Sequence, residues 1–271
     1  MGPDLMGDAA TNDLSFAASH HAESRISFVQ RCYQYFVFYG LLAAFGVSSL
    51  VWSLAATILH LLLPRRLGEP LGQFMIMGGC RYFVALMQLS GIIECDLAAL
   101  DRLQRRQSLV IIPNHPTLLD AVLVISRLPH VVCTTKARLL RNPFLGGSAR
   151  LAGFIRNDRP TRLVRDAIRQ VRAGRQLLIF PEGTRTSGAV VDQFKGGFAL
   201  IAKRAGAPVQ TVFIESNSRF LGKNWPLSRK PEFPLLYRVR LGPALPVDGD
   251  IHEFVRLLHH SYQSELGGAA S

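Results

Sequence analysis

The chain has 271 residues, of which 48% are hydrophobic and 18% are charged, and its formal net charge is +12. This length leaves roughly 200 residues for one globular domain beside a membrane segment. The four cysteines show no C-x-x-C or Cys/His ligand spacing, which argues against a zinc site and a disulfide framework. The positive charge favours anionic partners such as phospholipid surfaces, phosphorylated substrates, acidic carrier proteins or nucleic acid, without choosing among them.

The N-terminal region predicts a leader followed by a membrane helix. Residues 1–24 are small and polar and have little apolar surface to bury, so we expect a disordered leader. From Phe36 to Leu63 the chain contains no Asp, Glu, Lys or Arg. As a helix this stretch would be about 42 Å long, enough to cross a hydrocarbon core of about 30 Å. We interpret it as a transmembrane or deeply inserted helix rather than a signal peptide, because it starts late and lacks a small-residue cleavage pattern.

A second apolar segment follows, from Leu71 to Ile93, and it contains Gln73, Arg81 and Gln88. This composition suits a helix at the membrane interface, folded back against the first, better than a second span. A helix packed on the soluble domain is the alternative. We expect residues 25–95 to anchor the chain to the membrane.

The charges that flank the first helix bear on its orientation. Arg25 and Arg31 precede it, whereas Arg65, Arg66 and Arg81 follow it. By the positive-inside rule, this small excess favours a C-terminal portion in the cytoplasm. The predicted location is therefore the inner (cytoplasmic) membrane, with residues 96–271 on its cytoplasmic side.

Residues 96–271 alternate short β-rich runs with amphipathic helices, a pattern typical of an α/β domain. We expect a single domain with a central mixed sheet flanked by helices. Strands are predicted at 108–112, 131–135, 176–180 and 209–214, with an edge strand at 237–241. Helices are predicted at 117–126, 161–173 and 251–266.

The predicted helix at 161–173 carries a row of arginines opposite its apolar residues. The simpler interpretation is a solvated face on a helix that covers the sheet. The alternative is a docking surface for anionic lipid or for an acidic acyl carrier. The arginines concerned are Arg162, Arg165, Arg169 and Arg172.

Candidate chemistry begins with His115 and Asp120, in the segment NHPTLLD. A histidine at the end of a strand and an aspartate five positions later can meet at one strand-to-helix turn. There the carboxylate would orient the imidazole and stabilise its protonated form. Such a pair can take a proton from a hydroxyl, although an isolated His/Asp pair more often makes a structural hydrogen bond.

The segment FPEGTRT, Phe180 to Thr186, follows a predicted strand. It offers a tight turn at Gly183, the hydroxyl of Thr184 and the guanidinium group of Arg185. Backbone N–H groups near a glycine, with an arginine beside them, suit a phosphate monoester, whereas a plain surface turn is the alternative. Lys195, in the segment FKGG, would either add a second cation or cap the next helix.

Taken together, four ordered segments resemble the blocks of the glycerolipid acyltransferase family, which includes the bacterial 1-acylglycerol-3-phosphate acyltransferases. They are NHPTLLD, GFIRNDR at Gly153 to Arg159, FPEGTRT, and Ala207-Pro208-Val209. The resemblance covers about residues 108–214 and the layout with an N-terminal membrane helix.

The resemblance implies roles for particular residues. His115 would be the general base and Asp120 its partner. Arg159, in the second block, would bind the acceptor, and Lys136 resembles the lysine that often opens that block. The pocket for the acceptor's phosphate would be formed by Glu182, Gly183, Thr184 and Arg185.

The implied reaction transfers an acyl group from a thioester, acyl-CoA or acyl-carrier protein, to a lipid hydroxyl. The simplest acceptor is 1-acyl-sn-glycerol-3-phosphate. Two departures bear on the acceptor: Pro116 and Thr117 stand where a Gln-Ser start is common in members that form phosphatidic acid, and Thr211 stands where the fourth block often has a second proline. An ornithine lipid or a glycolipid is therefore the alternative acceptor.

Neither a cofactor nor a metal ion is expected, and the partners are the bilayer, the lipid acceptor and an acyl carrier protein. Motifs of serine hydrolases, P-loop proteins, dinucleotide-binding proteins and zinc proteases are missing from the sequence. A different class remains open, namely a non-catalytic basic binding protein at the membrane. Nucleic acid is not expected as its partner, because the arginine-rich helix has no interleaved aromatic residues.

Overall fold

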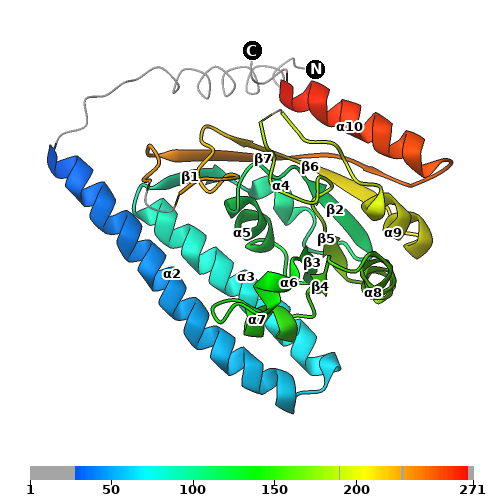
Figure 1. Cartoon of the computed structure of the whole chain (residues 1–271), viewed down its shortest axis with the longest axis horizontal. Coiled ribbons are helices and arrows are strands. Elements are labelled where there is room, and N and C mark those ends of the chain that lie inside the picture. The colour runs from blue at the N-terminus through cyan, green and yellow to red at the C-terminus, as the bar shows by residue number, and fades with distance from the viewer. Residues whose placement is uncertain (1–27, 189, 227–228, 268–271) are drawn as a thin grey trace, which may run out of the picture. The chain divides into compact units, whose positions relative to one another are not determined.

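The computed structural model describes residues 28–188, 190–226 and 229–267 (Figure 1). Among the described residues, those from 38 onwards form one compact unit and residues 28–37 belong to another. The predicted leader, residues 1–24, lies outside the described residues. The described part of residues 1–37 is the start of helix α2 (Phe28–Leu62), where Phe28 and Phe36 are exposed.

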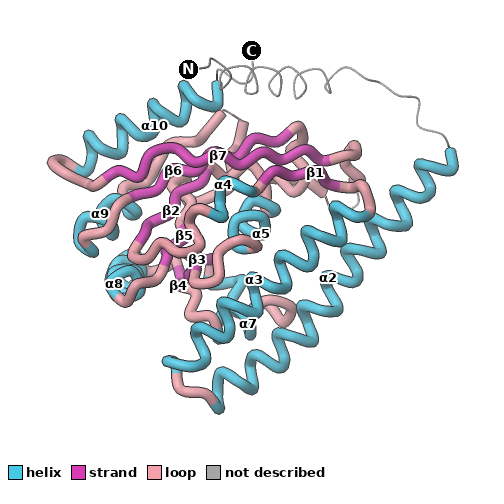
Figure 2. Tube along the Cα trace, turned by 180° about the vertical axis from the view of Figure 1, so that it is seen from behind, coloured by secondary structure: helices cyan, strands magenta, loops and turns pink. Residues whose placement is uncertain are grey.

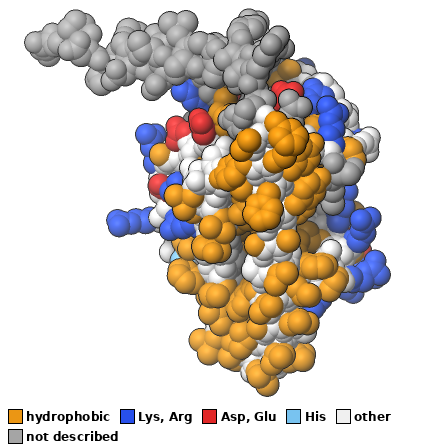
Figure 3. All heavy atoms as spheres, turned by 90° about the vertical axis from the view of Figure 1, so that its left-hand side faces the viewer, with side chains coloured by type: hydrophobic (Ala, Val, Ile, Leu, Met, Phe, Trp, Pro, Cys, Tyr) orange, Lys and Arg blue, Asp and Glu red, His pale blue; other side chains and the backbone are white. Residues whose placement is uncertain are grey.

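Helix α2 contains the apolar stretch that the sequence predicts as a membrane helix. Cys32–Leu62 is long and apolar enough to cross a membrane, and 11% of its most apolar window is buried. Helix α3 (Arg65–Leu89) runs back along it, with the rings of Phe45 and Phe83 4.5 Å apart. Figure 3 shows hydrophobic side chains gathered over these two helices. This exposed apolar face fits membrane association.

The opposite side of α2 packs on the α/β part of the chain. Helix α7 (Gly146–Leu151) approaches α2 so closely that the backbone N–H of Gly147 donates to Ser53 Oγ at 3.0 Å. Arg150 donates to Thr57 Oγ1 at 3.2 Å, one helical turn further along α2. The apolar helix is therefore joined to the α/β part along one side.

A seven-stranded sheet forms the centre of the α/β part, in the order β1-β7-β6-β2-β5-β3-β4. Strands β6 and β7 pair antiparallel, and the other neighbours pair parallel, so the predicted mixed sheet is confirmed. The strands are β1 (Ile93–Asp96), β2 (Leu109–Pro113), β3 (Val131–Thr135), β4 (Ile155–Arg156), β5 (Gln176–Leu178), β6 (Val209–Ser216) and β7 (Leu235–Leu245).

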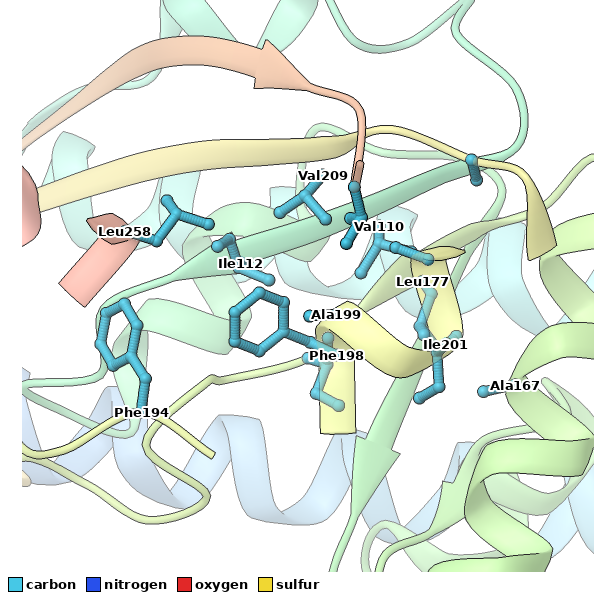
Figure 4. Close-up of a cluster of buried hydrophobic side chains, with 14 of the residues drawn as sticks. Val110, Ile112, Ala167, Leu177, Phe194, Phe198, Ala199, Ile201, Val209 and Leu258 are labelled. Atoms are coloured by element: carbon cyan, nitrogen blue, oxygen red, sulfur yellow. The ribbon is translucent and has the colours of Figure 1, made fainter. Parts of the chain in front are cut away.

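Helices cover both faces of the sheet (Figures 1 and 2). Successive side chains of β2 are all buried and point to opposite faces, as expected for a parallel strand inside a sheet. Val110 and Ile112 join the core under α8 (Pro160–Arg172), α9 (Gly197–Ala205) and α10 (Ile251–Gly267), shown in Figure 4. Helices α3 and α5 (Leu119–Ile125) lie on the other face. Two further helices, of four residues each, are α4 (Ala98–Asp101) and α6 (Ala137–Leu140).

Three expectations from the sequence need correction. The strand predicted at 237–241 is not an edge strand, because β7 pairs with β6 on one side and with β1 on the other. Strands β1 and β4 form the actual edges and were not predicted, since they are too short to show a period. The second helix was predicted at Leu71–Ile93, but α3 begins at Arg65, and Ile93 belongs to β1.

Helix α8 covers the sheet with its apolar side, as both interpretations of the arginine row expect, and a docking role of the arginines stays a prediction. Ala167 and Val171 are fully buried against the core, whereas the arginines lie on the exposed side. The division at residue 95/96 between an anchor and a catalytic domain stays a prediction, and β1 starts just before it.

The joint between α2 and α7 gives a first testable prediction. A Cβ on Gly147 would lie 1.9 Å from the Ser53 carbonyl oxygen, a backbone atom that cannot rotate away. Gly147→Ala should therefore lower the free energy of unfolding by about 1–3 kcal/mol, the usual cost of overpacking. Thermal unfolding in detergent measures this loss. Gly79→Ala is the control, because a Cβ there meets nothing within 4 Å; equal stability of the two variants would contradict the packing described.

Candidate active site

The candidate active site begins where β2 ends. Asn114 is buried, and its side-chain amide donates to the Ile214 carbonyl at 2.8 Å and accepts from the Ile214 N–H at 2.7 Å. The side chain thus makes the pair of hydrogen bonds that a backbone residue would make to β6. Because the side chain of Asn114 makes these bonds to β6, its backbone can turn away from the sheet. His115, the next residue, is thereby held at a defined position beside the end of β2.

His115 and Asp120 are in contact, with 3.0 Å between Nδ1 and Oδ2. Asp120 lies in the first turn of α5 and is completely buried, whereas the side chain of His115 is 12% exposed. A carboxylate at this distance favours a proton on Nδ1, because the carboxylate can only accept. The Nε2 atom of His115 is then the ring nitrogen that carries a lone pair.

Asp120 is oriented by a short chain of buried polar groups. Its Oδ2 accepts the backbone N–H of Thr117 at 2.7 Å, and its Oδ1 accepts the Thr117 hydroxyl at 2.7 Å. The Tyr237 hydroxyl, from β7, lies 3.2 Å from the same Thr117 oxygen. Burial raises the pKa of the Asp120 carboxyl, and the hydrogen bonds from His115 and Thr117 oppose that rise. Burial likewise raises the pKa of the Tyr237 phenol, so it stays neutral.

The ring of His115 is held on its flat side by Phe180. The two rings stack with centroids 3.7 Å apart and an angle of 17° between their planes. Since Phe180 lies two residues beyond the end of β5, the strand next to β2, the stacking joins the two strand ends. The imidazole is therefore restrained by a hydrogen bond at one edge and by an aromatic ring on one face.

Glu182 links the two motifs through its carboxylate. It is 2% exposed, and its Oε1 accepts the backbone N–H of His115 at 2.9 Å. Its Oε2 accepts the Thr186 hydroxyl at 2.8 Å and the Asp192 N–H at 2.9 Å. Burial raises the pKa of this carboxyl, and the three hydrogen bonds oppose that rise. With both oxygens engaged, Glu182 holds the loop in place; the role in phosphate binding that the resemblance implies stays a prediction.

Some N–H groups of the Arg185 guanidinium bind the protein backbone, and others are unoccupied within the described residues. Its Nη1 donates to the carbonyl oxygens of Leu221 and Gly222, each at 2.8 Å, and so holds the loop between β6 and β7. Within the described residues, its Nε and Nη2 groups have no hydrogen-bond partner. These two groups are therefore available to an anion.

The remaining predicted residues of this loop lie close by. Gly183 has φ of +72°, the left-handed conformation that glycine adopts without strain. A Cβ there would lie 2.8 Å from Lys195 Nζ, so the lysine stands directly against the turn. The side chain of Lys195 is exposed, and Thr184 is half-buried. The structure thus brings Lys195 to the FPEGTRT loop.

Lys136 and Arg159 lie further along the same edge of the sheet. Lys136 follows β3 and Arg159 follows β4, and both are exposed. At about 4.8 Å per strand, the ends of β3 and β4 are about 10 Å and about 14 Å from the end of β2. No hydrogen bond or ion pair joins either residue to the His115 site within the described ranges, so their role in acceptor binding stays a prediction.

A cavity of about 220 Å³ adjoins the site, and the sequence did not predict it. Pro116 and Thr186, neighbours of the two motifs, line one side of it. The other side belongs to the loop between β6 and β7 and carries three cations, Arg219, Lys223 and Arg229. A positive cavity beside His115 suits an anionic group of a substrate.

Several site residues were missed from the sequence because nothing near them marks a function. Tyr237 is 120 positions from the threonine that it contacts. Thr117 lies inside the first motif but was considered only as a departure from a family pattern. No group of three or more His, Cys, Asp or Glu residues able to hold a metal ion occurs in the described part of the chain.

Comparison with known proteins agrees with this geometry. The sequence model of a family described as Acyltransferase matches residues 95–215. Over 220 residues the chain is 26% identical to a 1-acyl-sn-glycerol-3-phosphate acyltransferase of Pseudomonas aeruginosa, covering 79% of this chain and 81% of that one. Over 113 residues it is 34% identical to a lyso-ornithine lipid O-acyltransferase of the same organism, covering 40% of this chain and 43% of the relative.

A solved structure shares the fold. The 1-acyl-sn-glycerophosphate (LPA) acyltransferase PlsC from Thermotoga maritima superposes with a TM-score of 0.61 at 18% sequence identity. The match covers 89% of this chain and 94% of that one. The predicted α/β architecture is therefore confirmed.

The buried chain behind Asp120 gives the second prediction. Thr117→Val removes a hydroxyl that donates to the carboxylate, so the pKa of Asp120 should rise further. Tyr237→Phe should raise it less, because the phenol acts through Thr117. Carbon-13 NMR of aspartate-labelled protein, with Asp120→Asn to assign the signal, measures both shifts. Thr117→Ser should restore the original pKa; no change in Thr117→Val would show that the hydroxyl has only a packing role.

Proposed function

We propose that this chain, which belongs to the acyltransferase family and is an acyltransferase, acts on a lysophospholipid-like hydroxyl. The simplest acceptor is 1-acyl-sn-glycerol-3-phosphate, and the product is then phosphatidic acid. The observation that carries this proposal is the contact of His115 with Asp120 directly beside the cation-bearing loop of Arg185. The name of the Pseudomonas aeruginosa relative supports the choice of acceptor.

The geometry supports a direct transfer with His115 as general base. Asp120 keeps the proton on Nδ1, so Nε2 accepts the proton of the acceptor hydroxyl as its oxygen attacks the thioester carbonyl. A bond forms between the acceptor oxygen and the carbonyl carbon, and the carbon–sulfur bond breaks. The imidazolium then returns its proton to the departing thiolate, and Asp120 stabilises the imidazolium in between.

In this proposal, the acceptor's phosphate binds to the free N–H donors of Arg185. Its Nε and Nη2 groups, the adjacent Lys195 and the backbone turn at Gly183 are cationic or donating groups within one loop. The cavity lined by Arg219, Lys223 and Arg229 extends this positive region. A phosphate held here would bring a hydroxyl of the same molecule towards His115.

A second acceptor is favoured by one comparison. The 34% identity to the lyso-ornithine lipid O-acyltransferase is the highest among the relatives described, although it covers 40% of this chain. The carboxylate of such a lipid would also suit the fork of Arg185. Thiol-release assays with each lyso-lipid as acceptor would distinguish the two, because only the true acceptor should give a low KM.

The donor and the location complete the proposal. An acyl thioester of coenzyme A or of acyl carrier protein supplies the acyl group, and neither a cofactor nor a metal takes part. The exposed apolar face of α2 and α3 supports attachment to a membrane. The excess of arginines after α2 favours the inner membrane, with the active site on its cytoplasmic side. The partners are then the bilayer and the lipid acceptor, without nucleic acid.

The role of His115 gives the third prediction. His115→Ala should lower kcat by about 10²- to 10⁴-fold, the usual contribution of a general base. Thiol release in detergent micelles measures this loss, and thermal unfolding and vesicle flotation should stay unchanged. The control is His252→Ala, since His252 is 97% exposed on α10. Full activity of His115→Ala would show that His115 is not the general base, whereas no thiol release from the unchanged chain would support a non-catalytic binding protein.

The fourth prediction concerns the anion site. Arg185→Ala should raise KM for a phosphate-bearing acceptor by about 10- to 100-fold, with a much smaller effect on KM for the donor. Asn217→Ala is the control for a loosened loop, because Asn217 donates to the Pro234 carbonyl within the loop between β6 and β7 and does not line the cavity. Equal changes in both Michaelis constants would argue against a phosphate site at Arg185.

A further inference from the structure

A second basic cleft lies on the β4 side of the sheet. It has a volume of about 290 Å³ and is bounded by the turn between α2 and α3, by α7 and by the start of α8. Apart from Arg159, which the resemblance links to acceptor binding, none of the residues around it is assigned to the His115 site, and the strand end nearest to it is about 14 Å from that of β2. Six arginines line it: Arg65, Arg150, Arg156, Arg159, Arg162 and Arg169.

The charges of this cleft are only partly compensated. Asp158 pairs with Arg156 at 2.6 Å, Asp166 pairs with Arg169 at 3.5 Å, and Arg150 donates to Thr57 and to the Leu140 carbonyl. Glu69, the third acid of the cleft, lies 3.7 Å from Arg175, outside it. The other three arginines have no hydrogen bond or ion pair to any described residue; they are Arg65, Arg159 and Arg162.

Unpaired arginines gathered around one cleft are costly unless an anion joins them, because like charges repel each other. A guanidinium group matches the oxygens of a phosphate with two parallel N–H groups. Three such groups around one cleft, none of them in an ion pair with an acid of the described residues, therefore point to a phosphate-bearing ligand.

The surroundings of the cleft indicate where this phosphate comes from. Arg65 directly follows the end of α2, where Leu61 is 80% exposed and Leu62 is 73% exposed. Leu67, on the first turn of α3, is 62% exposed. The arginines thus stand at the border of the apolar face of α2 and α3. This is the level at which a phospholipid changes from acyl chains to phosphate.

We infer that this cleft binds the phosphate of an anionic membrane phospholipid, at a site separate from the active site. The arginines take the phosphate, and the acyl chains extend over the leucines at the turn between α2 and α3. Arg65 and Arg162 lie outside the four motifs, whereas Arg159 belongs to the second, so the site rests on Arg65 and Arg162 and does not follow from the proposed reaction. Its occupancy would tie the domain to anionic regions of the bilayer.

Titration with a short-chain anionic lipid tests this inference. The full chain in neutral detergent should bind dihexanoyl phosphatidylglycerol, and the double variant R65Q/R162Q should bind it about tenfold more weakly. The matched control is R105Q/R256Q, which removes the same charge at two exposed sites outside the cleft and should change the affinity less than twofold. Equal losses in the two double variants would overturn the site, because only diffuse charge would then matter.

Two further measurements identify the source of the phosphate. Flotation with phosphatidylcholine vesicles, with and without phosphatidylglycerol, should show a gain from the anionic lipid that R65Q/R162Q loses and R105Q/R256Q keeps. Inorganic phosphate should give little thermal stabilisation. If inorganic phosphate instead stabilised the protein as strongly as the lipid, and R65Q/R162Q abolished this effect, the cleft would be a site for free phosphate and the inference of a lipid would be wrong.

Discussion

The carboxylate of Glu182 is the constraint on which the site depends. It receives one hydrogen bond from the strand end that carries His115 and two from the loop that carries Arg185. A buried carboxylate in such a position stabilises the loop only while its partners are present, since an unpaired charge inside the protein is costly. The base and the anion-binding loop are therefore parts of one hydrogen-bonded assembly, and neither can shift without the other.

Much of this site was predictable because its residues lie close together in the sequence. His115 follows β2, Asp120 lies in the first turn of the helix after it, and the FPEGTRT loop follows β5, the parallel neighbour of β2. The contributions of Tyr237 and of the loop between β6 and β7 depend on which strands are neighbours, which no local pattern encodes. The same holds for Lys136 and Arg159, whose motif positions say nothing about their distance from β2.

The fold was predictable to the same degree and for a similar reason. Buried strands such as β2, β3 and β6 can be recognised in the sequence from their runs of apolar residues. Strand β4 is two residues long and becomes a strand only because β3 offers its edge. Residues 237–241 were predicted at an edge of the sheet, yet the short β1 pairs with the outer side of β7.

The close contact between Gly147 and Ser53 has a consequence for which acceptor lipids can reach His115. Since α2 is held against α7 by the backbone, the height of His115 above the apolar face is set by the protein and not by the lipids around it. We expect the chain to select acceptor hydroxyls that lie at one level of the headgroup layer. A lipid whose hydroxyl lies deeper or shallower would have to leave its preferred position in the bilayer before it could react.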